Sequence, residues 1–164
     1  MKITKAQQPA GADAPIVHDP VYVTMDRPVY YVTERGPTLS VHPIFCGLAF
    51  ATTVLDVMQN TVEAAGWSIA HVGVYNPRPA RHKDGSLIKP KRWSNHAYAE
   101  AMDFKGVVGA NGKLVTIAEM KQRHPELLKK LLDSCAKAIA ALGRRAEIVD
   151  EGGWIHIGLW PVKA

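Results

Sequence analysis

Two histidines and one aspartate are the residues of this sequence best suited to binding a metal ion. His96 and Asp103 lie seven residues apart in the segment RWSNHAYAEAMDFKG (residues 92–106), and His156 lies in a short apolar run near the C-terminal end. A catalytic zinc site takes three protein ligands from His, Asp or Glu and keeps a fourth position for water. Two neighbouring ligands plus a remote one need only one long loop closure, whose entropic cost grows slowly with length. We therefore predict that these three residues hold one metal ion.

Each of the three residues also has an ordinary structural explanation. His156 is compatible with a buried core histidine whose ring is bonded to a backbone group. Asp103 is compatible with a residue that caps a turn, and His96 with a plain loop histidine. The spacing of the residues alone leaves these alternatives open.

The hydrophobic pattern predicts the elements that must position these residues. Residues 42–66 have apolar positions at helical spacing, with Pro43 in the first turn and Gly66 as the C-terminal cap. A second, strongly amphipathic helix is predicted over residues 124–143. Strands are predicted at 21–25 and 29–34, paired around Arg27-Pro28, then at 68–76 and 99–108, and in a final hairpin over 146–160.

This order of elements favours an α+β fold with an antiparallel sheet and helices on one side. The 164 residues suit a single domain, and 47% hydrophobic with 21% charged residues is an ordinary globular composition. Residues 1–20 are rich in Ala, Pro and Gln and lack periodicity, so we expect a flexible N-terminal arm followed by one domain over 21–164. No apolar run reaches the ~18 residues of a membrane span.

The positive charge of the chain is concentrated in one predicted loop. The chain carries a net charge of +5, and residues 76–95 hold six basic side chains against one acid, a difference of five. Such a rim attracts an acidic substrate or a polyanion, although it is equally compatible with a solvated loop. No nucleic-acid motif accompanies the charge, so we expect no nucleic-acid partner.

The two cysteines and the N-terminus give expectations about disulfide formation and about where the protein is made. Cys46 and Cys135 both fall in predicted helices, and we expect buried thiols rather than a disulfide. The N-terminus lacks the apolar core of a secretory signal. We therefore expect synthesis in the cytoplasm.

Three segments resemble a known family of enzymes. SNHAYAEAMDF resembles the S-x-H-x-x-G-x-A-x-D signature of the zinc D-alanyl-D-alanine carboxypeptidases and dipeptidases, and is more similar to the S-x-H-A-x-A-x-A-x-D form of the related extensin-like C-terminal domains. HVGVYNPR is similar to the family's strand ending in an arginine, and WIHIG to its W-x-H strand. The resemblance implies the small α+β fold of that family, which the hedgehog signalling domain shares.

The resemblance also implies roles for individual residues. It makes His96, Asp103 and His156 ligands of Zn²⁺, and it makes Ser94 the signature serine that supports the site through hydrogen bonds. Arg78 matches the arginine that steadies a substrate carbonyl or carboxylate. A nearby substitute for it is Arg81, and Trp154 shares the strand face of His156 and can wall the cleft.

The general base is where the sequence departs from the family pattern. Many members carry an acidic residue three positions before the last histidine, where this chain has Gly153. Other members end the preceding strand with Glu, and EIVDEGGWIH resembles that version. We therefore predict Glu151 as the base, with Asp150 as the second candidate; a third possibility is that the chain has no base. Ala99 replaces the signature glycine, as in the extensin-like form.

The implied activity is hydrolysis of peptide bonds in peptidoglycan stem peptides or cross-links, so peptidoglycan or its peptides are the expected partner. By analogy with phage lysis enzymes and exported effectors, such a protein acts on the wall or in the periplasm after release or specialised export. One alternative is a zinc-binding module without activity that binds a wall polymer or a protein. Others are a virion structural protein and a nucleic-acid binder.

Overall fold

The computed structural model describes residues 1–9 and 14–161. The strands, in chain order, are β1 (Lys2–Lys5), β2 (Pro20–Thr24), β3 (Tyr30–Thr33), β4 (Gly36–Leu39), β5 (Ile44–Gly47), β6 (Ser68–His71), β7 (Ala101–Val108), β8 (Leu114–Thr116), β9 (Ala146–Asp150) and β10 (Ile155–Leu159). The helical segments are α1 (Leu48–Phe50), η1 (Ala51–Leu55), α2 (Asp56–Val62), η2 (Glu63–Ala65), η3 (Asn95–Tyr98), α3 (Ile117–Arg123) and α4 (Pro125–Ala141).

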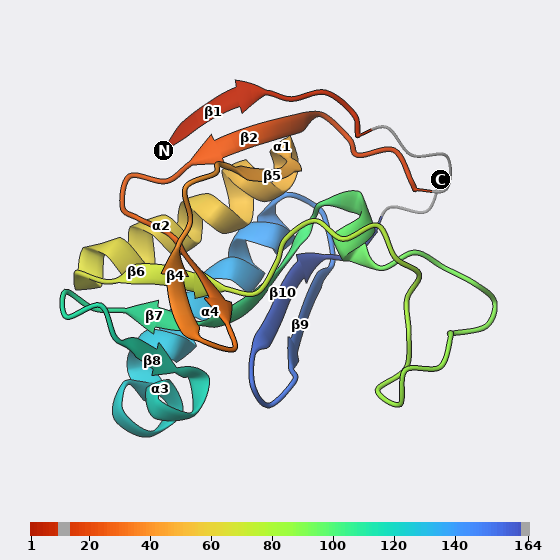
Figure 1. Ribbon diagram of the computed structural model, residues 1–164. Helices are drawn as coiled ribbons and strands as arrows, with labels where there is room; N and C mark the ends of the chain where they lie inside the picture. The colour runs from red at the N-terminus through yellow and green to blue at the C-terminus, as the bar shows by residue number, and fades with distance from the viewer. Residues whose placement is uncertain (10–13, 162–164) are drawn as a thin grey trace.

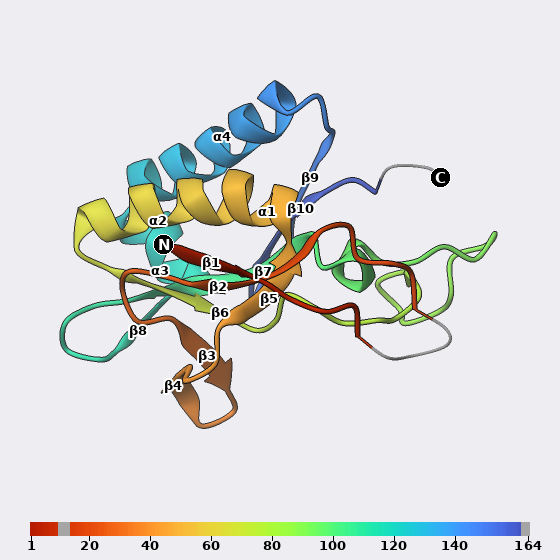
Figure 2. The same ribbon diagram turned by 90° about the horizontal axis from the view of Figure 1, so that it is seen from above.

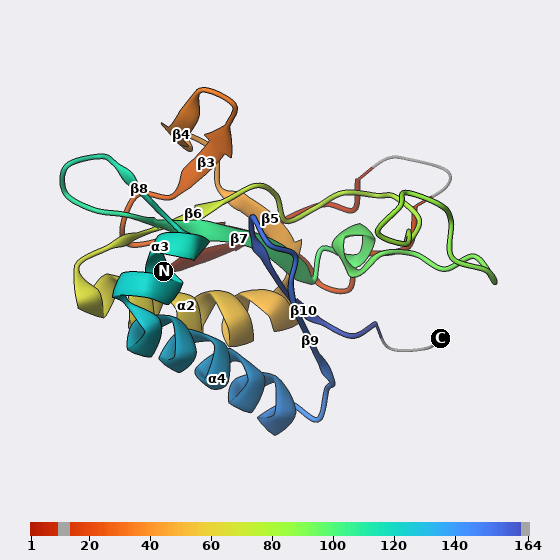
Figure 3. The same ribbon diagram turned by 90° about the horizontal axis from the view of Figure 1, so that it is seen from below.

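These elements form a single α+β domain, as predicted, but its main sheet is mixed rather than purely antiparallel. That sheet has the order β4-β3-β6-β7-β10-β9, with β8 added against β7. The pairing of β3 with β6 is parallel, and the other pairings in the sheet are antiparallel. A smaller sheet, β1-β2-β5, lies beside it (Figure 1). The helices α2 and α4 lie on one side of the main sheet, and the β3–β4 hairpin projects on the other (Figures 2 and 3).

The N-terminal third of the chain differs most from the sequence-based prediction. The predicted pairing of 21–25 with 29–34 is wrong, because β2 pairs with β1 and β5 whereas β3 pairs with β4 and β6. The predicted arm is also wrong for Lys2–Lys5, which form β1; positions 10–13 of the arm lie outside the described residues.

The predicted helix over 42–66 begins later than expected. Ile44–Gly47 form β5, and a continuous helical run then extends from Leu48 to Ala65. Gly66 ends the run in the left-handed conformation with φ of 83°, which a glycine adopts without steric cost. Cys46 therefore lies on a strand rather than on a helix. Both cysteines are free and buried, and burial raises the pKa of each thiol to about 12, so neither is reactive.

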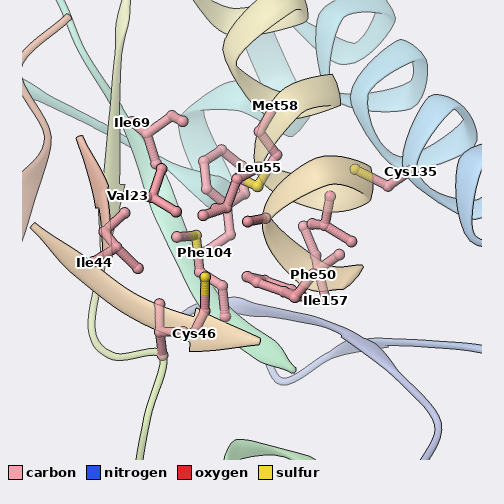
Figure 4. Close-up of a cluster of buried hydrophobic side chains, with 14 of the residues drawn as sticks. Val23, Ile44, Cys46, Phe50, Leu55, Met58, Ile69, Phe104, Cys135 and Ile157 are labelled. Atoms are coloured by element: carbon pink, nitrogen blue, oxygen red, sulfur yellow. The ribbon is translucent and has the colours of Figure 1, made fainter. Parts of the chain in front are cut away.

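The hydrophobic core lies between the helices and the sheets. Figure 4 shows Phe50, Leu55 and Met58 from the first helical run packed against Phe104 of β7 and Ile157 of β10. The amphipathic helix α4 begins with Pro125 at its first turn and buries one stripe of side chains against this core. The helix predicted over residues 124–143 and the predicted final hairpin are thus present. The core holds β7 and β10, the two strands that carry the candidate site. None of the helices in the described residues has the length and apolar character needed to cross a bilayer.

Candidate metal centre

Asp103 and His156 face each other across two neighbouring strands. In the antiparallel pair β7–β10 the two residues are direct partners in the register. Side chains alternate between the faces of a strand, so Met102 and Phe104 point into the core while Asp103 points to the opposite face. The register thereby brings together two residues that are 53 positions apart in the sequence.

His96 reaches the same point from the short helix η3, just before β7. The Ser94 hydroxyl accepts a hydrogen bond from the His96 backbone N–H at 3.2 Å and so caps this helical turn. The turn ends at Ala99 with φ of 55°, a left-handed conformation that favours glycine. This conformation gives a physical reason for the glycine of the signature, and the resulting geometry aims the His96 ring at Asp103.

The three side chains form a compact group of metal-ligating atoms. Asp103 Oδ1 lies 3.1 Å from His96 Nε2 and 3.3 Å from His156 Nδ1, and one ligand atom of each residue lies within 4.8 Å of the others. Tetrahedral zinc with bonds of about 2.0–2.2 Å places its ligand atoms about 3.4 Å apart. The two Asp103 contacts are close to this spacing, and the whole group stays within 4.8 Å.

The hydrogen bonds around the histidines support the same conclusion. The Val74 carbonyl accepts a hydrogen bond from His96 Nδ1 at 2.9 Å, which leaves Nε2 as the nitrogen turned toward Asp103. A ring nitrogen without a proton and a carboxylate oxygen are both acceptors, so they attract one another only through a proton or a metal ion. The chemistry of the donor set therefore suits a bound cation.

The charges of the group are strongly coupled. Burial opposes the ionisation of Asp103, but the contacts of its carboxyl with the His156 and His96 rings outweigh burial and hold the pKa of that carboxyl well below its usual range. Burial likewise opposes the charged form of His156, but Asp103 and Glu147 raise the pKa of its ring to about 9. Without a metal ion, His156 is thus an imidazolium between two carboxylates at neutral pH.

Glu147 is the residue at this site that sequence reasoning missed. Its Oε1 lies 3.1 Å from His156 Nε2, on the side of the ring away from Asp103, although the ring N–H is not aligned with that oxygen. The His156 ring holds the pKa of the Glu147 carboxyl below its usual range despite burial, and Asn95 and Arg92 act in the same direction. The signal that could have found Glu147 is strand parity, because β9 pairs with β10 and places Glu147 and Val149 on the face of His156.

The two candidate bases lie on different sides of the hairpin. Glu151 lines a cavity of about 390 Å³ together with the three candidate ligands. Asp150 has the opposite strand parity to Glu147; it pairs with Lys121 of α3 and accepts a hydrogen bond from the Gly152 N–H. The structure therefore places Glu151 at the site and Asp150 away from it. The catalytic role of either residue stays a prediction.

The remaining predicted site residues also line this cavity. Arg78, Arg81, Ser94 and Trp154 lie in its wall, with further basic side chains from the loop that Figure 1 shows extending beyond the sheet. The Arg81 guanidinium donates to the Gly85 carbonyl at 3.1 Å and is partly held by its own loop. Basic side chains and the carboxylates of Asp103, Glu147 and Glu151 thus line one cavity together with the candidate metal centre.

One comparison with known proteins gives a match. The model of the family described as "Extensin-like protein C-terminus" matches residues 42–152, which include His96 and Asp103 and end four positions before His156. No curated protein and no solved structure matches the chain.

Proposed function

The chain belongs to the extensin-like C-terminal domain family, part of the D-Ala-D-Ala carboxypeptidase-like peptidase group, and from this premise we propose that it is a zinc-dependent peptidase of peptidoglycan. The observation that carries the proposal is the convergence of His96, Asp103 and His156 in the wall of one cavity. Its substrates would be stem peptides or the cross-links between them.

The metal would be held by His96, Asp103 and His156. When bound, zinc supplies a Lewis acid that activates water and polarises a peptide carbonyl. Water and a substrate carbonyl would enter from the cavity, which all three candidate ligands line. The oxygen of the attacking water and the carbonyl group of the peptide would thereby be held close together.

Glu151 and Arg78 would serve the two ends of the reacting bond. Glu151 would take a proton from the attacking water and pass it to the leaving amine. Arg78 would bind the developing oxyanion or a terminal carboxylate, for which a guanidinium is well suited. The basic wall of the cavity suits a substrate with free carboxylates, as stem peptides carry.

The experiment that tests the proposal combines metal content and turnover in one sample. The protein is purified without chelator, zinc is counted per chain, and purified peptidoglycan is digested and analysed by mass. We expect about one zinc per chain and chelator-sensitive fragments, whose masses identify the bond. Glu151→Gln should keep the zinc and lose at least about 100-fold in turnover, the range typical of general-base loss. Zinc without any fragments would overturn the peptidase.

A second candidate function is a zinc-binding module that does not hydrolyse peptides. It is favoured by Gly153 at the usual position of the base and by the orientation of Asp150 toward Lys121. This module would bind a wall polymer or a protein. It predicts stoichiometric zinc and peptidoglycan binding that survives Glu151→Gln unchanged.

A further inference from the structure

We propose that Glu147 is a positioning residue for the metal centre, which sets His156 to ligate through Nδ1 by holding the proton on Nε2. The inference rests on the metal site of the proposed function and assigns a residue that neither the family signature nor the sequence analysis includes.

The His156 ring lies between two carboxylates. Its Nδ1 lies 3.3 Å from Asp103 Oδ1, whereas its Nε2 lies 3.1 Å from Glu147 Oε1. The two nitrogens stand on opposite edges of an imidazole, so the two carboxylates flank the ring from either side. One nitrogen therefore faces the candidate ligands, and the other faces Glu147.

Glu147 is placed to orient a ligand rather than to be one. The group of atoms within 4.8 Å of one another comprises His96, Asp103 and His156 and does not include Glu147. Metal-ligating histidines commonly donate their second ring N–H to a carboxylate, which fixes the tautomer and raises the basicity of the ligating nitrogen. The Glu147 carboxylate lies 3.1 Å from His156 Nε2, which has no other hydrogen-bond partner among the described residues.

The surroundings of Glu147 hold it in place. It is about one-quarter exposed and projects from the hydrogen-bonded strand β9 opposite Gly158 of β10. The absence of a side chain at Gly158 leaves the space that the Asn95 amide occupies, and that amide donates to the Leu159 carbonyl at 3.2 Å. The carboxylate is thus a fixed acceptor behind His156.

The test reads the ligating nitrogen directly. Protein with ¹⁵N-labelled histidine is loaded with zinc, and the side-chain nitrogen shifts are assigned by NMR. We expect His156 to be metal-bound through Nδ1 and to carry its proton on Nε2. A metal-bound Nε2 in the wild-type protein would overturn the inference.

Variants of the carboxylate then test its role. Zinc affinity is measured by chelator competition at pH 7.5 and again at pH 9.5 for every variant. Glu147→Ala should lose 10–100-fold in affinity, the usual cost of removing such a partner, and should show both coordination modes of His156. Glu147→Gln should recover part of the loss, because an amide oxygen still accepts the N–H. Circular dichroism of each variant verifies that it is folded.

The matched control is Glu151→Gln, which changes another acid of the same cavity. It should retain wild-type zinc affinity and a single coordination mode. Glu147→Ala with wild-type affinity and an Nδ1-only His156 would overturn the inference. Because no step involves peptidoglycan, the expected NMR result together with absent hydrolysis would refute the peptidase and leave the role of Glu147 intact.

Discussion

The two faces of the β7–β10 strand pair have opposite chemistry although they share one backbone. On the helix side lie Met102 and Phe104, which are fully buried in the core. On the other side, Asp103 and His156 face a basic cavity. Period-two alternation separates the two sets by a single residue, so the candidate metal centre and the core share one strand pair.

The difference shows that stability and chemistry are separable at adjacent positions. The helix side is held by apolar contact, which tolerates substitutions of similar volume and shape. The cavity side depends on charges that must meet within about 3 Å, where one changed atom alters the electrostatics. Substitutions on one face should therefore change a different property from substitutions on the other.

The largest effect is expected from Asp103→Ala. This change removes the only anionic member of the candidate ligand set, and we expect loss of stoichiometric zinc, as for His96→Ala and His156→Ala. Zinc per chain after gel filtration is the measurement. Met102→Leu, next to Asp103 on the helix side, is the control and should keep its zinc. If the aspartate variant also retains one zinc, the assigned site is wrong.

The next effect is expected on the helix side. Phe104→Ala should lower the free energy of unfolding by about 3–5 kcal/mol, because a fully buried aromatic side chain is replaced by a cavity. Urea denaturation in the presence of chelator measures this loss without a contribution from metal binding. Val149→Ala, on the cavity side of β9 and 36% exposed, should change stability by less than about 1 kcal/mol. Equal losses for the two variants would contradict the separation of the faces.

A smaller effect is expected from adding one methyl group at Gly158. A Cβ there would lie 2.8 Å from Ala101 Cβ and 2.8 Å from Asn95 Nδ2, so Gly158→Ala should cost about 1–3 kcal/mol. The same change at Gly153 meets only the flexible end of Lys105 at 3.3 Å and should cost much less. Thermal unfolding of both variants compares them. A harmless Gly158→Ala would mean that the strands can separate at this point.

Much of this structure could be predicted from local sequence patterns. The apolar stripe of α4, the Gly152 turn between β9 and β10, and the spacing of His96 and Asp103 are all legible within short windows of sequence. His156 was predicted as well, because WIHIG resembles the W-x-H strand of the family. These features depend on contacts between near neighbours or on a signature that the chain retains.

The features that sequence missed depend on pairing between distant segments. Nothing in Pro20–Thr24 says that β2 pairs with β1 and β5 rather than with β3. Ile44–Gly47 has the apolar spacing of a helix start, yet its pairing with β2 makes it a strand. The prediction of a base relied on the number of residues before His156. Strand parity decides which acids of β9 face His156, and it places Glu147 on that face and Asp150 on the other.

The effect most sensitive to conditions is the pH dependence of zinc binding. The pKa of His156 is raised to about 9, so zinc must displace a proton from it at neutral pH. Each unit of pH below 9 should weaken apparent zinc affinity about tenfold, with a plateau above pH 9. Calorimetry in two buffers of different ionisation enthalpy should count about one proton released from His156 per zinc at pH 7.5. A flat affinity between pH 7 and 9 would mean that His156 is neutral.

The same proton should have the opposite effect on folding of the metal-free protein. A group whose pKa is higher in the folded state stabilises the fold below its unfolded value of 6.5, and this contribution is lost as pH rises through about 9. From His156 alone, stability in chelator should therefore fall between pH 6.5 and 9 while zinc affinity rises. Phe104→Ala should shift the whole stability curve downward without changing its pH dependence, since its side chain faces the core. Zinc affinity that rises with pH while metal-free stability falls would be the signature of His156 on the cavity side. A Phe104→Ala variant with the same pH dependence as the wild type would show that the helix side does not contribute to this titration.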